Sequence, residues 1–164
     1  MGWIMPERDT DRMLPRVPRM LLHLLWRVTR GMTMGVRAIV TDADERVLLV
    51  RHTYTPGWHL PGGGIEAGET AVEALARELI EEAGVVLTGP ARLHGAFFNS
   101  AVSNRDHVLV YLVDDFTRDD SRRRAREIAE VRFFDLRALP DDVTPGTRRR
   151  LAELADGAEI GARW

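Results

Sequence analysis

The sequence predicts a mixed α+β or α/β sandwich. Runs rich in β-branched residues lie on both sides of one central amphipathic helix, and a second helix follows the last run. A glycine-rich loop comes directly before the central helix. A chain of 164 residues has room for one domain with a full core, and its hydrophobic content of 45% and charged content of 29% are ordinary for a globular protein.

Composition excludes several kinds of site and partner. The chain has no cysteine, so disulfides, thiolate zinc sites and cysteine nucleophiles are ruled out. A formal net charge of −2 gives no reason to expect nucleic acid or an anionic membrane over the whole surface. No apolar run reaches the roughly 18 residues of a membrane span. His23 and Arg27 interrupt the apolar N-terminal run, which argues against a signal peptide. We therefore expect a cytoplasmic protein.

The first 30 residues are predicted to lie outside the main domain. The three prolines within residues 1–18 predict a flexible arm, and the pattern of polar and apolar residues over 19–30 predicts a short amphipathic helix. The apolar arc of this helix is too wide for a free surface helix. We expect this apolar arc to be covered by packing against the domain, or against a second subunit in a homodimer. Weak contact with an anionic membrane interface through Trp26 is the alternative.

The remaining boundaries follow from the pattern of runs and turns. Residues 31–158 are predicted as the main domain and 159–164 as a C-terminal tail. Residues 35–42 and 46–53 are β-rich and flank a polar turn, which predicts a hairpin. The glycine-rich loop that follows has a short strand at 58–60. Further strands are predicted at residues 93–98, 107–114 and 131–134, and a last helix at residues 147–155.

The central helix is predicted over residues 70–83. Thr70 is an N-cap with Glu73 in capping-box position, and Gly84 is a C-terminal stop. An apolar face suits packing on a sheet and consists of Val72, Leu75, Ala76, Leu79 and Ala83.

Another face of this helix carries a row of three glutamates. Glu78, Glu81 and Glu82 stand at i, i+3 and i+4, so they share one face, where each like-charge contact costs about 0.2–0.5 kcal/mol. Taken alone, such a triplet is more often a solvated acidic face. The glycine-rich loop before the helix favours a metal–phosphate site instead, because Mg²⁺ binds carboxylate and carbonyl oxygens beside substrate phosphates.

The residues from Gly63 to Val85 also carry a family resemblance. The spacing Gly63-x5-Glu69-x7-Arg77-Glu78-Leu79-x-Glu81-Glu82-x-Gly84-Val85 resembles the Nudix box of MutT-like hydrolases at every defined position. The resemblance implies an α/β/α sandwich with a mixed sheet and a catalytic loop and helix. It also implies Mg²⁺-dependent hydrolysis, with Mn²⁺ as a substitute, of a nucleoside diphosphate linked to another group.

The resemblance further implies roles for individual residues. Glu78, Glu81 and Glu82 would hold the metals and orient or deprotonate the attacking water, and which of them is the base stays open. The carbonyl of Gly62 matches a metal-ligand position. Glu69 and Arg77 would pin the loop to the helix, a supporting part of the catalytic set.

A fourth carboxylate is expected just before a late strand. Glu127 and Glu130 are the candidates, and Glu127 is preferred, although a plain surface charge beside the arginine run 122–126 explains it equally well. That run is interpreted as a solvated loop, with contact to a polyphosphate or RNA as the alternative.

Substrate contacts are expected from the loop and the facing strands. Tyr54 or Trp58 could stack on a nucleobase, and an arginine could hold a terminal phosphate. For each candidate alone, core packing or plain surface is the commoner role. The candidates are Arg37, Arg51, Tyr54, Trp58, His59, Phe98, Asn99, Arg105 and His107.

Three functions fit this fold, and the sequence favours one. A non-catalytic nucleotide sensor is the alternative to a pyrophosphohydrolase, but such proteins usually have a degraded box and an added DNA-binding domain, and neither feature occurs in this sequence. An isomerase of isopentenyl diphosphate would rely on a cysteine, which the chain lacks. We therefore predict a hydrolase of a small nucleotide-type substrate, with the identity of that substrate open.

Overall fold

The computed structural model describes residues 31–164, and Met32–Trp164 form one compact unit. The arm predicted for residues 1–18 and the helix predicted for residues 19–30 lie outside the described residues. The elements are β1 (Thr33–Val40), β2 (Arg46–His52), β3 (Trp58–His59), α2 (Ala71–Ala83), β4 (Val85–Leu87), β5 (Arg92–Phe98), β6 (Asp106–Val113), β7 (Phe116–Arg118), a 3₁₀ turn (Asp120–Arg122), β8 (Ile128–Asp135) and α3 (Pro145–Ala155).

The strands form three small sheets. In the mixed sheet β6 is central, with β1 parallel to it on one side and β5 antiparallel on the other. In the second sheet β2 lies between β3 and β8, all antiparallel. β4 and β7 form a third, two-stranded sheet. Among residues 31–164, no helix is long and apolar enough to cross a membrane.

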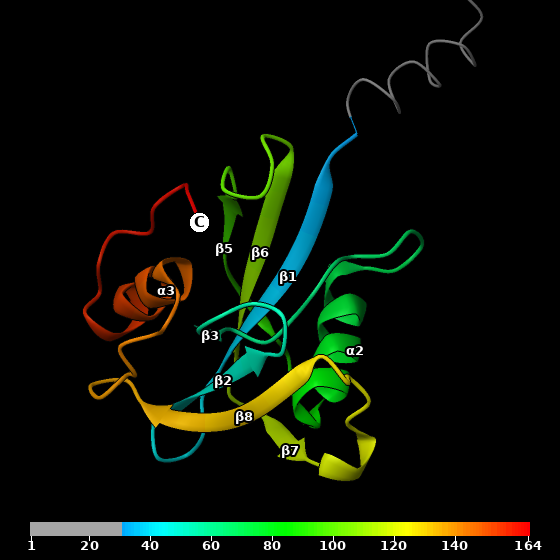
Figure 1. Ribbon diagram of the computed structural model, residues 1–164, viewed down its shortest axis with the longest axis vertical. Coiled ribbons are helices and arrows are strands. Elements are labelled where there is room, and N and C mark those ends of the chain that lie inside the picture. Colours follow the sequence, from blue (N-terminus) through cyan, green and yellow to red (C-terminus); the bar gives the residue numbers. More distant parts are fainter. Residues whose placement is uncertain (1–30) are drawn as a thin grey trace, which may run out of the picture. The chain divides into compact units, whose positions relative to one another are not determined.

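The core divides along β1 and β2, because alternate side chains of a strand point to opposite faces. Val36, Ala38 and Val40 belong to the cluster that contains Leu75, Leu79 and Ala83 of α2. Val72, predicted on the same face of that helix, is exposed instead. Ile39 belongs to a second cluster, which includes Leu151 of α3. The two helices therefore cover opposite faces of these strands, as Figure 1 shows. The predicted α/β/α sandwich with a mixed sheet is confirmed.

The predicted hairpin between the first two strands is wrong. Apart from one isolated bridge between Thr41 and Val47, β1 pairs with β6 and β2 pairs with β3 and β8. The turn itself forms, since the Asp42 carboxylate accepts the backbone N–H of Arg46 at 2.8 Å. The chain reverses there and passes from one sheet to the other. Both strands are apolar on both faces, and such runs do not reveal their pairing partner.

The helices follow the predictions closely. Thr70 caps α2 with both hydrogen bonds of the capping box to Glu73, and Gly84 ends it in the left-handed conformation at φ 65°. α3 begins two residues earlier than predicted, at Pro145. β4 and β7 are three residues each and are not evident from the sequence, because runs so short have no measurable periodicity.

The segment predicted as a tail lies against the mixed sheet. The Phe98 N–H donates to the Ala162 carbonyl at 2.9 Å, and the Trp164 N–H donates to the Phe98 carbonyl at 3.0 Å. The Trp164 ring lies so close to Gly146, at the start of α3, that a Cβ there would be 2.4 Å from the indole nitrogen. Residues 162–164 are thereby held between β5 and α3.

Candidate active site

The glycine-rich loop is hydrogen-bonded to the edge of β1. The Val36 N–H donates to the Gly63 carbonyl at 2.8 Å, and the Ala38 N–H donates to the Pro61 carbonyl at 2.9 Å. Gly62 between them has φ 135°, and a Cβ at this position would lie 2.2 Å from the Val36 carbonyl oxygen. Only glycine fits there. The close approach directs the Gly62 N–H to the Glu82 carboxylate, at 2.8 Å.

Arg77 ties the same loop to α2. Its guanidinium contacts the Glu69 carboxylate at 2.7 Å, the Gly64 carbonyl at 3.1 Å and the Glu78 carboxylate at 2.7 Å. The hydrogen bond from Arg77 lowers the pKa of Glu69, and the same bond raises the pKa of Arg77. The contact expected between Glu69 and Arg77 is present, and Arg77 also fixes the direction of the Glu78 carboxylate.

Glu82 is a buried carboxylate among other carboxylates. The residue is only 7% exposed. Burial raises its pKa to about 7, and the nearby Glu78 and Glu127 add to this, while the Gly62 N–H and Arg37 act in the opposite direction. A carboxylate that is both desolvated and next to like charges is stabilised by a bound cation.

This raised pKa makes a prediction about the metal-free protein. The folded state binds a proton at Glu82 more tightly than the unfolded chain does, so the stability contributed by this group falls as pH rises from about 4.5 to about 7. In a chelator, the melting temperature of the wild type relative to Glu82→Gln should therefore drop across this interval and level off above it. A difference that does not vary with pH would show that Glu82 titrates normally.

The carboxylates face a cavity of about 840 Å³. Glu78 and Glu82 from α2, Glu127 from the segment before β8, and the Gly62–Gly64 loop all line it. Other residues that line this cavity include Arg37, His52, Tyr54, His59, Asn99, Asp106, Thr147, Arg149 and Trp164.

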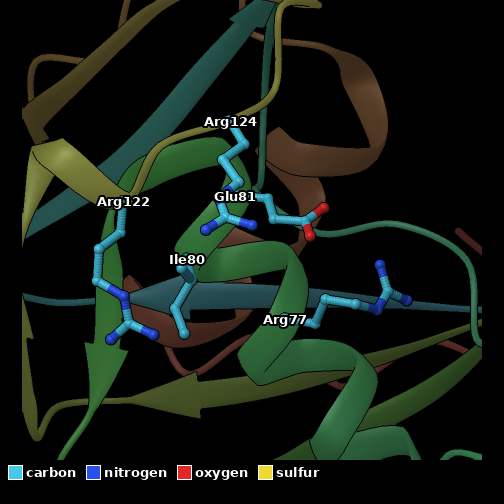
Figure 2. A pocket seen from close by; sticks show the side chains of 5 residues that line it. All are labelled: Arg77, Ile80, Glu81, Arg122 and Arg124. Atoms are coloured by element: carbon cyan, nitrogen blue, oxygen red, sulfur yellow. The ribbon is translucent and has the colours of Figure 1, made fainter.

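Of the two candidates for a fourth carboxylate, the structure places Glu127 in this cavity. Glu130 does not line it and pairs with Arg132 instead. Glu81 does not line this cavity, and lines instead a smaller pocket beside α2 together with Arg122 and Arg124 (Figure 2). Glu81 therefore does not join Glu78 and Glu82 at the cavity.

The residues at the cavity fit a hard divalent cation. Within residues 31–164, no three His, Asp or Glu side chains are grouped closely enough to hold a metal ion by themselves. Mg²⁺ does not need such a cage, because it usually binds one or two carboxylates together with waters and substrate phosphates. The loop is shaped around a carboxylate, since a Cβ on Gly63 would lie 2.4 Å from the carboxyl group of Glu78. The Gly62 carbonyl accepts Arg37 at 2.5 Å, so a cation there would share this oxygen with Arg37.

Four of the substrate candidates line the cavity. Tyr54 is 67% exposed, and its ring lies 5.2 Å from that of His52. The amide of Asn99, a residue that is 8% exposed, donates to the Asp106 carboxylate at 2.8 Å. His59 and Arg37 complete the set, and Arg37 donates to the carbonyls of Leu60 and Gly62.

Five candidates lie elsewhere. Trp58 is 2% exposed and packs edge-to-face on Phe134, so its ring is part of the core. Arg51 lies 4.6 Å above the Trp58 ring and pairs with Asp142 at 2.8 Å. These contacts occupy both groups, and neither lines the cavity. The remaining three, which also do not line it, are Phe98, Arg105 and His107.

Sequence reasoning misses several residues of the cavity wall. His52 has a pKa lowered to about 4, by burial first and then by Arg37 and His59, so it is neutral at pH 7. Asp106 accepts both Asn99 and the Thr33 hydroxyl, at 2.8 and 2.7 Å. The sequence did contain a signal for Asp106: Asn99 directly follows the strand predicted at 93–98, and Asp106 directly precedes the strand predicted at 107–114. Nothing local in the sequence indicates Trp164, which contacts the cavity only through tertiary packing.

The sandwich places the buried Glu82 and the half-buried Glu78 next to a glycine loop, and the similar proteins below share this class of enzyme, a hydrolase that acts on phosphorus-containing acid anhydrides. The chain belongs to the Nudix family: the family model described as "NUDIX domain" matches residues 31–154. Hydrolases of this family generally need a divalent metal ion, and small nucleotide-type substrates fit them.

Similar proteins agree with this assignment. A protein of Bacillus subtilis named "Putative 8-oxo-dGTP diphosphatase" is 28% identical over 127 residues, which are 77% of this chain and 83% of that protein. An ADP-ribose pyrophosphatase of Methanocaldococcus jannaschii is 31% identical over 106 residues, 62% of this chain and 61% of that protein. The crystal structure of a MutT NUDIX hydrolase from Burkholderia pseudomallei matches with a TM-score of 0.66 at 27% identity, covering 76% of this chain and 99% of that one.

Proposed function

We propose that this protein is a Mg²⁺-dependent pyrophosphohydrolase that cleaves a nucleoside diphosphate linked to another moiety. The observation that carries the proposal is the convergence of Glu78, Glu82 and Glu127 on one cavity beside the Gly62–Gly64 loop. Phosphate oxygens repel a nucleophile, so hydrolysis there needs a group that neutralises their charge.

Each residue of the site has a part in this reaction. Glu78, Glu82 and Glu127 would hold the metal ion, which would supply positive charge beside the phosphates and make the attacking water more acidic. Arg77 keeps the Glu78 carboxylate in place through its 2.7 Å contact. The Gly62 N–H does the same for Glu82 at 2.8 Å. The role of Glu81 as a metal ligand stays a prediction from the family resemblance.

The other wall of the cavity suits the nucleoside part of the substrate. Tyr54 exposes its ring there, and such a ring can stack on a nucleobase. Asn99 and His59 offer hydrogen-bonding groups on the same lining. The relatives named for 8-oxo-dGTP and ADP-ribose support nucleoside diphosphate derivatives as the substrate class. A homodimer and a cytoplasmic location stay predictions.

A screen of substrate classes tests the proposal. Nucleoside triphosphates, oxidised nucleotides, nucleotide sugars and dinucleoside polyphosphates would each be incubated with the protein and Mg²⁺, and the products identified by chromatography. At least one class should yield products of phosphoanhydride cleavage. Binding without turnover in every class would instead indicate a nucleotide sensor.

Metal removal gives a second expected result on any confirmed substrate. Chelation should abolish turnover, and added Mg²⁺ should restore it, because the carboxylates alone increase the negative charge that the nucleophile meets. Mn²⁺ should substitute, whereas Ca²⁺, which is larger and prefers more ligands, should support turnover poorly. Unchanged turnover in excess chelator would contradict the metal requirement.

A further inference from the structure

A second pocket lies beside the catalytic helix, outside the cavity. Its volume is about 230 Å³, and it is lined by Arg77, Ile80 and Glu81 of α2 and by Arg122 and Arg124. In Figure 2, Arg122 and Arg124 extend from the segment before β8, and Ile80 lies on the helix between Arg122 and Arg77. The Glu81 and Arg77 side chains extend away from Arg122.

Neither of the two loop arginines forms an ion pair in the described part of the chain, although Glu81 lines the same pocket. Within the described part of the chain, neither Arg122 nor Arg124 has an acidic side chain within 4 Å or donates a side-chain hydrogen bond, and both are exposed. Arg77, in contrast, is paired with Glu69 and Glu78. The pocket therefore presents two free guanidinium groups, which can bind phosphate oxygens in bidentate geometry.

Backbone contacts hold this loop in place, so the arginines are not on a freely moving segment. The N–H groups of Arg124 and Ala125 both donate to the Glu81 carbonyl at 3.1 Å. The Arg123 side chain donates to the Glu82 carbonyl at 3.2 Å. The Arg123 side chain thus satisfies a backbone carbonyl at the end of α2, while the side chains of Arg122 and Arg124 remain available to bind a ligand. A segment whose backbone is held in advance loses less entropy when its side chains bind an anion.

The pocket adjoins the metal-binding face. Arg77 lines the pocket and contacts Glu78, which lines the cavity. The segment that carries Arg122 and Arg124 also carries Glu127 into the cavity three residues later. A chain of phosphates bound at the cavity carboxylates through a metal therefore has a cationic neighbour on this side.

We propose that Arg122 and Arg124 form a phosphate-binding subsite, which takes a phosphate group in addition to those held at the metal face. That phosphate belongs either to the substrate itself, which would favour triphosphates over diphosphate-linked compounds, or to free inorganic phosphate. The assignment to a substrate phosphate rests on the proposed function, whereas binding of phosphate to the pocket does not.

Calorimetric titration with inorganic tripolyphosphate, in chelator, tests the pocket without turnover. The variants are R122A/R124A and, as a matched control, R126A, which removes an exposed arginine of the same loop that does not line the pocket. The wild type should bind tripolyphosphate, R122A/R124A about tenfold more weakly or worse, and R126A within about twofold. Equal binding by all three proteins, or equal weakening by R126A, would overturn the proposal. R122Q/R124Q, which keeps most of the side-chain volume, repeats the test should the alanine pair lose its native melting temperature.

Kinetics with Mg²⁺ then separates the two sources of phosphate. If the substrate supplies it, R122A/R124A should raise KM for a nucleoside triphosphate about tenfold and leave KM for ADP-ribose unchanged. If free phosphate is the ligand, neither KM should change, and added inorganic phosphate should alter the rate of the wild type but not of the variant. Lack of turnover in all proteins would contradict the proposed function and leave the binding result standing.

Discussion

Replacing Glu82 by glutamine is expected to lower kcat by roughly 10²- to 10⁴-fold, the scale of a lost catalytic carboxylate. The glutamine side chain keeps an oxygen that can accept the Gly62 N–H, so the loop should stay in place while the charge that would hold the metal is lost. Glu78→Gln should have an effect of similar size, because Glu78 lines the same cavity. Steady-state kinetics on a confirmed substrate measures both.

Glu73→Gln on the same helix is the matched control. Glu73 lies outside the cavity lining, and its capping-box role in accepting the Thr70 N–H can be filled by glutamine. Its kcat should stay within about twofold of the wild type, as for surface changes that leave structure intact. Near wild-type kcat for Glu82→Gln would show that the assignment of Glu82 to the metal site is wrong.

Gly62→Ala is expected to have the largest effect on stability. A Cβ at this position would lie 2.2 Å from the Val36 carbonyl oxygen, and the backbone has φ 135°, which alanine rarely adopts. Strain and overpacking together should cost about 2–5 kcal/mol, or roughly 5–15 °C in melting temperature. Because β1 would be pushed from the loop, the hydrogen bond to Glu82 should also weaken and activity should fall.

Gly64→Ala provides the comparison within the same loop. A Cβ on Gly64 would meet no atom within 4 Å, and Gly64 has no positive φ. Its melting temperature should change by no more than about 2 °C, as for a surface substitution. Thermal unfolding of the two variants side by side separates the effect of the close approach from a general loss of glycine. Equal melting temperatures would contradict the geometry described for Gly62.

Local signals predicted the catalytic helix and its loop correctly, for physical reasons. The capping box of Thr70 and Glu73 and the stop at Gly84 are interactions within a few residues, so the sequence displays them directly. The spacing of Glu78 and Glu82 likewise follows from helix geometry. The preference for Glu127 over Glu130 agrees with the cavity lining: Glu127 precedes β8 and lines the cavity, whereas Glu130 lies within β8 and pairs with Arg132.

Long-range packing was the part that could not be predicted. Trp58 and Arg51 are conspicuous in the sequence, but Trp58 packs on Phe134 and Arg51 pairs with Asp142, both distant in the chain. The partner of β1 is β6, and an apolar run buried on both faces does not identify such a partner. Glu81 lines a pocket together with Arg122 and Arg124, which lie several strands further along the chain.

Turnover in water enriched with ¹⁸O, followed by mass spectrometry of the products, tests the central claim most directly. With Mg²⁺ and a confirmed substrate, hydrolysis of a phosphoanhydride should place one ¹⁸O atom in one phosphate-bearing product, and Glu82→Gln should form almost none of it. Absence of label from every phosphate-bearing product, or equal labelling by Glu82→Gln and the wild type, would contradict hydrolysis at this carboxylate site.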